Sequence, residues 1–384
     1  MQITGGFMLE QLKKLDKKFL YTIGIIIALP ILLIIVLAIV RGCSSGKTYE
    51  NYEKKMISAA EKYVKDKKKE PKSEGEKYTV TLDKLVSGGY IKSTEKYLKD
   101  STCKGSVTVQ NNGASIKENE GGFLLYYSDL KCKDYKTKNL SSELISKETK
   151  TGSGLYKVGD EYIFKGQDDT SNDKYVENYI NFYGTLYRIM KIDSNGDLKL
   201  IKVENEARSY RWDDKYNEVE KHGYGENDFE TSLILENLYT IYKKEKTYSK
   251  NAKKYIVSKN LCVGKRSIND KQLTNNSDCE IVLEKQLVSL PNINDFALAS
   301  LDPDCKTIDS GSCRNFNYLS NFLYESWTMN GVKENTYEVY YLASGMPYYA
   351  EANQYIDYNM VIYISGHIID FSGSGTEKDP YVVK

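Results

Sequence analysis

The sequence predicts an α+β protein built from an N-terminal transmembrane helix, a small helix-plus-hairpin module and a larger α+β domain. Three observations support this fold class. An apolar run without a charge lies near the N-terminus, the spacing of apolar residues changes from helical to alternating along the chain, and six cysteines form three closely spaced pairs. We expect a leading segment over residues 1–18, a span over 19–40, a first module over 48–137, a linker over 138–154 and a second domain over 155–384.

The apolar run extends from Phe19 to Val40 and contains 22 residues. At 1.5 Å per residue, a helix of this length spans roughly 33 Å, enough for the hydrocarbon core of a bilayer. A buried helix of a water-soluble protein would have a polar face, and a cleaved signal peptide would have a shorter apolar region. Cys43 resembles the cysteine of a lipoprotein signal, but Arg41 lies where such signals need a small residue. We therefore expect an uncleaved anchor in the lipid bilayer.

The orientation of this anchor does not follow from the basic residues, because four lie on each side of the span. They are Lys13, Lys14, Lys17 and Lys18 before it, and Arg41, Lys47, Lys54 and Lys55 after it. The cysteines indicate the orientation instead, because an even number of cysteines at short spacings is typical of a protein in an oxidising compartment. We expect a cytoplasmic N-terminus, two extracellular modules and three disulfides: Cys103 with Cys132, Cys262 with Cys279, and Cys305 with Cys313.

The first module begins with apolar residues at helical spacing over 49–69, followed by a short helix over 82–86. From Cys103 the period changes to two, and Asn112–Gly113 lies between two alternating stretches, which predicts a β-hairpin. Cys103 opens the first strand and Cys132 closes the second, so the pairing of the strands brings the two cysteines together.

The layout of residues 19–137 resembles the pilin-like ectodomains of low-GC Gram-positive bacteria. The resemblance rests on the anchor, the long helix, "VTLDKLVSGGYI" and the cysteine-bounded "CKGSVTV" and "CKDYKT". It implies a stalk, or a component of a surface filament or export apparatus. The prepilin-peptidase signature, a Gly before Phe with a Glu five residues on, is absent from "GGFMLEQ", which favours the stalk.

The stretch from Leu140 to Gly154 is rich in Ser, Thr, Lys and Gly and has no apolar period, so it reads as a linker. Beyond it, alternating strands surround a turn at Asn195–Gly196, and an amphipathic helix is expected from Phe229 to Lys244. A helical turn at 292–300 and several short strands complete a pattern that favours an α+β domain.

The order of these pieces over 155–384 is similar to a recurrent surface domain of Gram-positive bacteria. It rests on "FYGTLYRIMKIDSNGDLKLI", "LVSLPNINDFALA", "SWTMN", "VIYISG" and "GSGTEKDPY". The resemblance implies the C-type-lectin-like fold that this domain shares with formylglycine-generating enzymes. Those enzymes use a copper-binding cysteine pair near the end of the domain, whereas Cys305 and Cys313 precede Trp327. We therefore expect this pair to close a loop rather than to bind a metal.

Composition and motifs exclude several other classes of function. The net charge is +1 and is evenly spread, which gives no footprint for nucleic acid. His222 and His367 are the two histidines of the sequence, and no Cys-x-x-Cys occurs, so we expect no zinc site. No Gly-x-Ser-x-Gly elbow precedes a helix. The sequence therefore indicates no catalytic residue and no cofactor, and it favours a protein that is not an enzyme.

The stretch "DSNGDLKLIKVE" imitates a calcium loop through Asp193, Asn195, Asp197 and Glu204. The sixth position of such a loop needs Gly and is Leu198 here, and the flanks are strands rather than helices. A hairpin turn is the better interpretation, and we predict no metal site.

Recognition of another molecule is the remaining class. Aromatic rings beside hydrogen-bonding groups suit sugars or protein surfaces. Trp327 fits the core tryptophan of the domain, whereas Trp212 is flanked by charges and is expected at the surface. The residues predicted to bind a ligand are Arg208, Tyr210, Trp212, Tyr324, Tyr348 and Tyr349.

We therefore expect a membrane-anchored cell-surface protein that presents a non-catalytic recognition domain to a glycan or a surface protein. The alternatives are a pilin-like component of a filament or export apparatus, and an enzyme that modifies the cell surface. The sequence does not distinguish the ligands.

Overall fold

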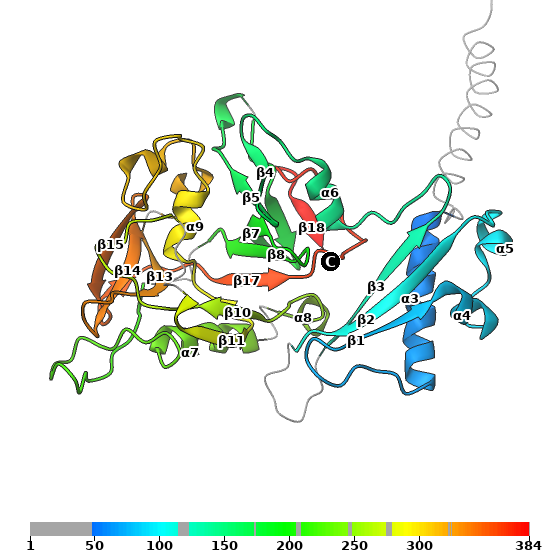
Figure 1. Cartoon of the computed structure of the whole chain (residues 1–384), viewed down its shortest axis with the longest axis horizontal. Coiled ribbons are helices and arrows are strands. Elements are labelled where there is room, and N and C mark those ends of the chain that lie inside the picture. The colour runs from blue at the N-terminus through cyan, green and yellow to red at the C-terminus, as the bar shows by residue number, and fades with distance from the viewer. Residues whose placement is uncertain are drawn as a thin grey trace, which may run out of the picture.

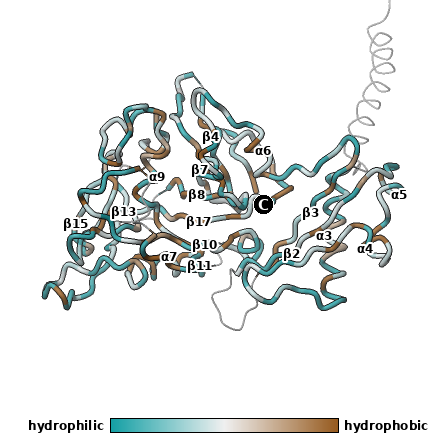
Figure 2. The backbone as a smooth tube through the Cα atoms, viewed as in Figure 1, coloured by the Kyte–Doolittle hydropathy of each residue, from teal (hydrophilic) through white to brown (hydrophobic). Residues whose placement is uncertain are grey.

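The structure, a computed structural model, describes residues 48–384 except 114–122, 173, 205–208, 245–247, 274–278, 322, 324 and 384. A small module over 48–137 lies beside a larger domain, and the C-terminal strand ends between them (Figure 1). Each part has its own apolar core. Apolar residues recur along the helices and strands of both, whereas many of the outer loops are hydrophilic (Figure 2).

The fold-class prediction of an α+β protein with a transmembrane helix is corrected by the structure. Within the residues that it describes, no helix has the length and apolar character needed to cross a membrane. These residues form a mixed α/β architecture with seven α-helices and several antiparallel sheets. The predicted span over 19–40 and the leading segment 1–18 lie outside them.

The small module packs one long helix on a three-stranded antiparallel sheet. Helix α3 (Tyr49–Asp66) begins where Thr48 Oγ1 accepts a hydrogen bond from the N–H of Asn51. The face that it buries carries Tyr52, Met56, Ala59 and Ala60. The sheet has the order β1 (Lys77–Thr81), β2 (Lys104–Asn111), β3 (Leu124–Lys131), and the short helices α4 (Leu82–Ser87) and α5 (Thr94–Leu98) connect β1 to β2.

The hairpin and its disulfide are confirmed. Strands β2 and β3 are antiparallel with Lys104 opposite Lys131, and the Cys103–Cys132 bond joins the residues at their ends. The buried Glu53 links α3 to the sheet, because its carboxylate accepts hydrogen bonds from Ser128 at 3.1 Å and Tyr135 at 2.6 Å. Burial raises the pKa of Glu53.

The predicted linker over 138–154 is partly wrong, because it contains helix α6 (Leu140–Ser146). Asn139 and Ser142 form a reciprocal capping box at its start. Leu140 and Leu144 are buried in the core of the large domain. This helix therefore belongs to the large domain rather than to a flexible connection.

The large domain is centred on an eight-stranded sheet with the order β12-β17-β8-β7-β5-β4, while β6 pairs with β7 and β18. The pairs are antiparallel except β6 with β18, which is parallel. The strands are β4 (Gly154–Val158), β5 (Glu161–Lys165), β6 (Tyr179–Phe182), β7 (Thr185–Ile192), β8 (Leu198–Lys202), β12 (Val288–Ser289), β17 (Val361–Ile364) and β18 (Tyr381–Val383).

Smaller elements surround this sheet. The predicted helix over 229–244 is present as α7 (Leu233–Lys243), and the predicted helical turn over 292–300 is α9 (Ile293–Leu298). Helix α8 (Lys250–Lys253) lies toward the small module (Figure 1). The remaining strands are β9 (Tyr210–Arg211), β10 (Lys259–Cys262), β11 (Val282–Gln286), β13 (Glu325–Gly331), β14 (Glu338–Ala343), β15 (Met346–Glu351) and β16 (Tyr355–Ile356).

The two parts are joined by polar contacts rather than by the chain alone. The Asn112 amide at the end of β2 donates hydrogen bonds to the carbonyls of Lys254 at 2.5 Å and Ile256 at 2.8 Å. The Tyr127 ring stacks on His367 with centroids 4.2 Å apart. Between the parts, a polar cleft of about 600 Å³ receives residues from both.

Candidate functional site

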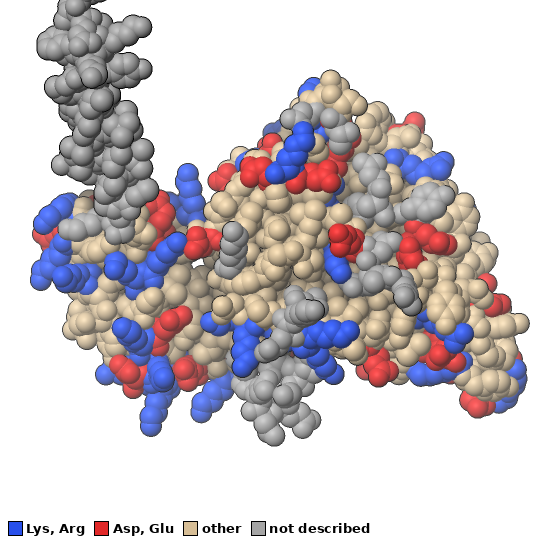
Figure 3. Space-filling model, turned by 180° about the vertical axis from the view of Figure 1, so that it is seen from behind, with Lys and Arg blue, Asp and Glu red and all other residues tan. Residues whose placement is uncertain are grey.

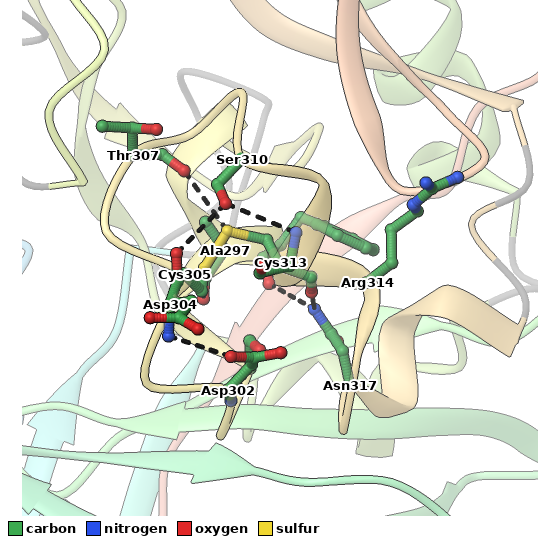
Figure 4. The surroundings of a disulfide bond; sticks show 12 residues. Ala297, Asp302, Asp304, Cys305, Thr307, Ser310, Cys313, Arg314 and Asn317 are labelled. Carbon is green, nitrogen blue, oxygen red and sulfur yellow. Dashed lines mark hydrogen bonds between the residues drawn. A yellow bond between two sulfur atoms is a disulfide. The ribbon is translucent and has the colours of Figure 1, made fainter.

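The loop from Cys305 to Cys313 is closed by a disulfide, as the sequence predicts (Figure 4). The Cys262–Cys279 bond is confirmed as well. Inside the closed loop, Ser310 Oγ donates to the carbonyl of Asp304 at 3.1 Å. The loop ends in a 3-10 turn over Gly311–Arg314. It has an internal scaffold of hydrogen bonds besides the covalent bridge.

Asn317 fixes this loop to the domain (Figure 4). Its side chain is buried, and its amide donates to the carbonyls of Phe296 at 2.7 Å and Cys313 at 2.8 Å. One side chain thereby holds the end of the disulfide loop against helix α9. Since buried polar groups need partners, these bonds also satisfy the amide of the buried Asn317 side chain.

The disulfide loop supports the turn of the β14–β15 hairpin. Ser344 and Gly345 connect the two strands, both with positive φ, of 49° and 76°, which is the pattern of a type I′ turn. A methyl group on Gly345 would lie 2.5 Å from Cζ of Phe296 and 2.6 Å from Cγ of Arg314. Only glycine permits this approach, so the turn lies directly against the end of the disulfide loop.

Strand β15 presents two exposed tyrosines on this support. Tyr348 is 51% exposed and Tyr349 is 47% exposed. Among the described residues, β15 pairs with β14 alone, so it forms the edge of the three-stranded sheet β13-β14-β15. Successive residues of a strand point to opposite faces, and the two rings therefore lie on the two sides of this edge.

Each exposed ring rests on a more deeply buried aromatic ring of β14. Tyr348 lies 6.0 Å from Tyr341, which in turn meets the buried Trp327 at 5.8 Å. On the other face, Tyr349 meets the edge of the buried Tyr340 at 6.1 Å. Burial raises the pKa of Tyr340 and of Tyr341, so both phenols stay protonated near neutral pH. These contacts fix the orientations of both exposed rings without covering them.

The other predicted site residues are placed differently. Tyr210 is half-buried, and its carbonyl accepts a hydrogen bond from Nε1 of Trp327 at 2.9 Å. Arg208 and Tyr324 lie outside the described residues. Of the predicted set, the structure brings Tyr348 and Tyr349 together on one strand.

Trp212 is a correction, because its side chain is fully buried instead of exposed. Its indole Nε1 donates to the carbonyl of Thr328 at 3.0 Å, and its ring packs against Phe229. The neighbouring Asp213 is buried too, and its carboxylate accepts from the backbone N–H groups of Glu226 and Leu233. The charge of Asp213 therefore belongs to the interior, although Arg211 and Asp214 beside it remain partly exposed.

Sequence reasoning missed two surface features of the same domain. Tyr355 on β16 is 63% exposed, and the guanidinium of Arg211 lies 4.8 Å from its ring centroid. Phe316 is 52% exposed and adopts a positive φ of 47°, which is uncommon for a bulky residue. Both residues lie next to long loops, where the spacing of apolar residues does not predict which side chains are exposed.

In the stretch that imitates a calcium loop, Asp193 and Asp197 form ion pairs with Lys259. Nζ of Lys259 lies 2.6 Å from a carboxylate oxygen of Asp193 and 2.6 Å from one of Asp197. Burial lowers the pKa of Lys259, but the two carboxylates outweigh burial and raise it overall. An ammonium group thus occupies the space between these carboxylates, in keeping with the interpretation as a hairpin turn.

Comparison with known proteins adds no relatives: no family model, curated protein or solved structure matches the chain. The resemblances to pilin-like ectodomains and to C-type-lectin-like domains therefore stay predictions from the sequence.

Proposed function

We propose that this protein is an extracellular, non-catalytic binding protein that holds a glycan against the edge of strand β15. The observation that supports the proposal is the pair of half-exposed tyrosines, Tyr348 and Tyr349, held by aromatic contacts on a braced hairpin. Rigid, exposed aromatic rings lose little side-chain entropy when a ligand binds to them.

The chemistry of the edge suits a sugar. A tyrosine ring offers an apolar face to the C–H side of a sugar ring, and its hydroxyl group can exchange hydrogen bonds with sugar hydroxyls. Glu351 at the end of β15 adds a carboxylate acceptor on the same strand. The three disulfides favour an oxidising environment, where extracellular glycans are found.

A glycan array probed with the full-length protein tests the proposal. We expect binding to a restricted set of glycans, and we expect Tyr348→Ala and Tyr349→Ala each to weaken it by about tenfold, the loss of one stacked aromatic contact. The melting temperature of both variants should stay close to that of the parent protein, because neither ring fills the core.

Tyr216→Ala is the matched control, since this tyrosine is 53% exposed on another loop. It should leave glycan binding unchanged. Equal binding by the Tyr348 and Tyr349 variants and the parent would reject the β15 edge as the site. Binding to a surface protein but to no glycan would reject the ligand class.

A further inference from the structure

A second hollow lies in the small module, away from the β15 edge. It has a volume of about 370 Å³ and lies between α3 and the segment from Tyr90 to Tyr97. Lys55, Ser58 and Lys62 contribute one wall, and they follow one another along a single face of α3. We call this hollow the α3–α5 groove.

The charges of the α3–α5 groove have one sign. Lys55, Lys62 and Lys92 all line it, and no acidic residue does. In the described part of the chain, no carboxylate lies within ion-pair distance of these three ammonium groups. Three unpaired positive charges around one small hollow repel one another and attract an anion.

Two acidic side chains of this region are engaged elsewhere, whereas Glu61 and Glu95 are exposed and do not line the groove. Glu53 of α3 faces the sheet, where Ser128 and Tyr135 donate to it. Asp66 at the end of α3 accepts a hydrogen bond from the hydroxyl of Tyr90 at 3.1 Å. On the face opposite to that of Figure 1, lysine and arginine side chains are numerous over the small module (Figure 3).

The walls of the groove are aromatic and are held in place. The Tyr97 ring lies 5.4 Å from the buried Tyr52, and the Tyr90 ring meets the edge of Tyr63 at 5.2 Å. The ammonium of Lys55 lies 5.6 Å from the centroid of Tyr97. Both tyrosines are half-buried, so each keeps one surface available beside the lysines.

We propose that the α3–α5 groove binds a phosphate ester of a small polyol. The phosphate group carries close to two negative charges and three acceptor oxygens, which match three ammonium groups around one space. The carbon skeleton of the polyol lies against Tyr90 and Tyr97. This site is independent of the glycan site proposed above, because it lies in the other module.

Titration calorimetry on the full-length protein tests the proposal with three probes: glycerol 3-phosphate, glycerol and inorganic phosphate. We expect heat of binding with glycerol 3-phosphate and none with glycerol. The affinity should fall as the salt concentration rises, since partly exposed charges are screened. Inorganic phosphate should bind more weakly, because it cannot contact the tyrosines.

The triple variant Lys55→Gln, Lys62→Gln and Lys92→Gln should lose affinity for glycerol 3-phosphate by at least about tenfold. The matched control is the triple variant Lys84→Gln, Lys96→Gln and Lys104→Gln. These lysines are exposed on the same module but do not line the groove. The control removes the same charge and should change the affinity less than about twofold. Thermal unfolding of both variants checks that the fold is retained.

Three outcomes would overturn the proposal. The parent protein could give no heat with glycerol 3-phosphate, or the groove variant could bind as well as the control. Equal affinity for inorganic phosphate and glycerol 3-phosphate would remove the role of the aromatic walls and would leave a general anion site instead.

Discussion

At the scale of single residues, the two tryptophans have the same environment although their sequence contexts differ. Trp212 and Trp327 are both fully buried, and each indole N–H donates to a backbone carbonyl. Each ring therefore contributes packing as well as one hydrogen bond to the core of the large domain.

Replacing either tryptophan by alanine should lower the free energy of unfolding by roughly 3–5 kcal/mol, because each change leaves a large cavity. Urea unfolding of Trp212→Ala and Trp327→Ala measures this. Tyr355→Ala is the control, since its ring is 63% exposed, and it should change stability by less than about 0.5 kcal/mol. A normally stable Trp212→Ala variant would contradict its position in the core.

The sequence could predict Trp327 as a core residue but not Trp212. Charged neighbours usually mark a surface, and this general rule failed because Asp213 is used inside the domain to bind backbone N–H groups. Those N–H groups belong to residues 226 and 233, and no local pattern relates them to Asp213. By contrast, Tyr348 and Tyr349 lie in a polar stretch and are exposed, as their context indicates.

At the scale of elements, the Cys305–Cys313 loop acts as a brace for the β14–β15 turn. Arg314 and Phe296 both approach Gly345 closely, and the disulfide limits how far Arg314 can move away. The covalent bridge therefore affects the edge strand without touching the exposed tyrosines.

Replacing Cys305 and Cys313 together by serine should lower the free energy of unfolding by roughly 2–3 kcal/mol, the value for closing a nine-residue loop in the chain-entropy model. Glycan binding should weaken less than in Tyr348→Ala, because the rings keep their own aromatic contacts. Thermal unfolding and the glycan array give the two readings. Unchanged stability would show that the loop is held by its hydrogen bonds alone.

The prediction of elements was most successful where the apolar period is clear. The β2–β3 hairpin and the helices over 229–244 and 292–300 follow directly from spacing and turn residues. Helix α6 was missed because a Ser- and Lys-rich composition suggested a linker. Its signal was present, since Asn139 and Ser142 form a capping box, and Leu140 and Leu144 are one helical turn apart.

At the scale of the whole molecule, the small module and the large domain contact one another through His367 and Asn112. His367 stacks on Tyr127 and is largely withdrawn from water. Burial, and next the positive charge of Lys77, lower the pKa of His367. This contact therefore favours the neutral imidazole.

The sign of the resulting pH dependence follows from linkage. The unfolded chain has the ordinary histidine pKa of about 6.5 and binds a proton before the folded chain does. The stability that this contact gives is therefore complete above about pH 6.5 and falls as the pH is lowered toward the depressed pKa of the folded state.

His367→Phe should reduce this loss, because phenylalanine keeps a stacking ring but does not titrate. Urea unfolding between about pH 7 and pH 5 compares the two proteins, and the parent should show the steeper decrease in stability. Parallel decreases in parent and variant would mean that His367 does not contribute to the acid sensitivity.

The contact between modules is the part that the sequence could not predict. Asn112 was identified as a turn residue, but its amide binds carbonyls more than 140 positions further along the chain. The expectation of a stalk followed from the resemblance of residues 19–137 to pilin-like ectodomains, and the expectation of a separate domain followed from the composition of the linker. Neither carries information about such long-range pairs.

The Cys103–Cys132 bond gives the small module a property that appears only under tension. It joins the base of the β2–β3 hairpin. Once the contacts of Asn112 and Tyr127 with the large domain have separated, a pulling force along the chain passes through the sulfur atoms rather than through residues 104–131. Reduction would release about 100 Å of additional chain under stretching, at roughly 3.4 Å for each of the 29 residue steps. A small module stretched between its two ends would thus resist extension for as long as its surroundings stay oxidising.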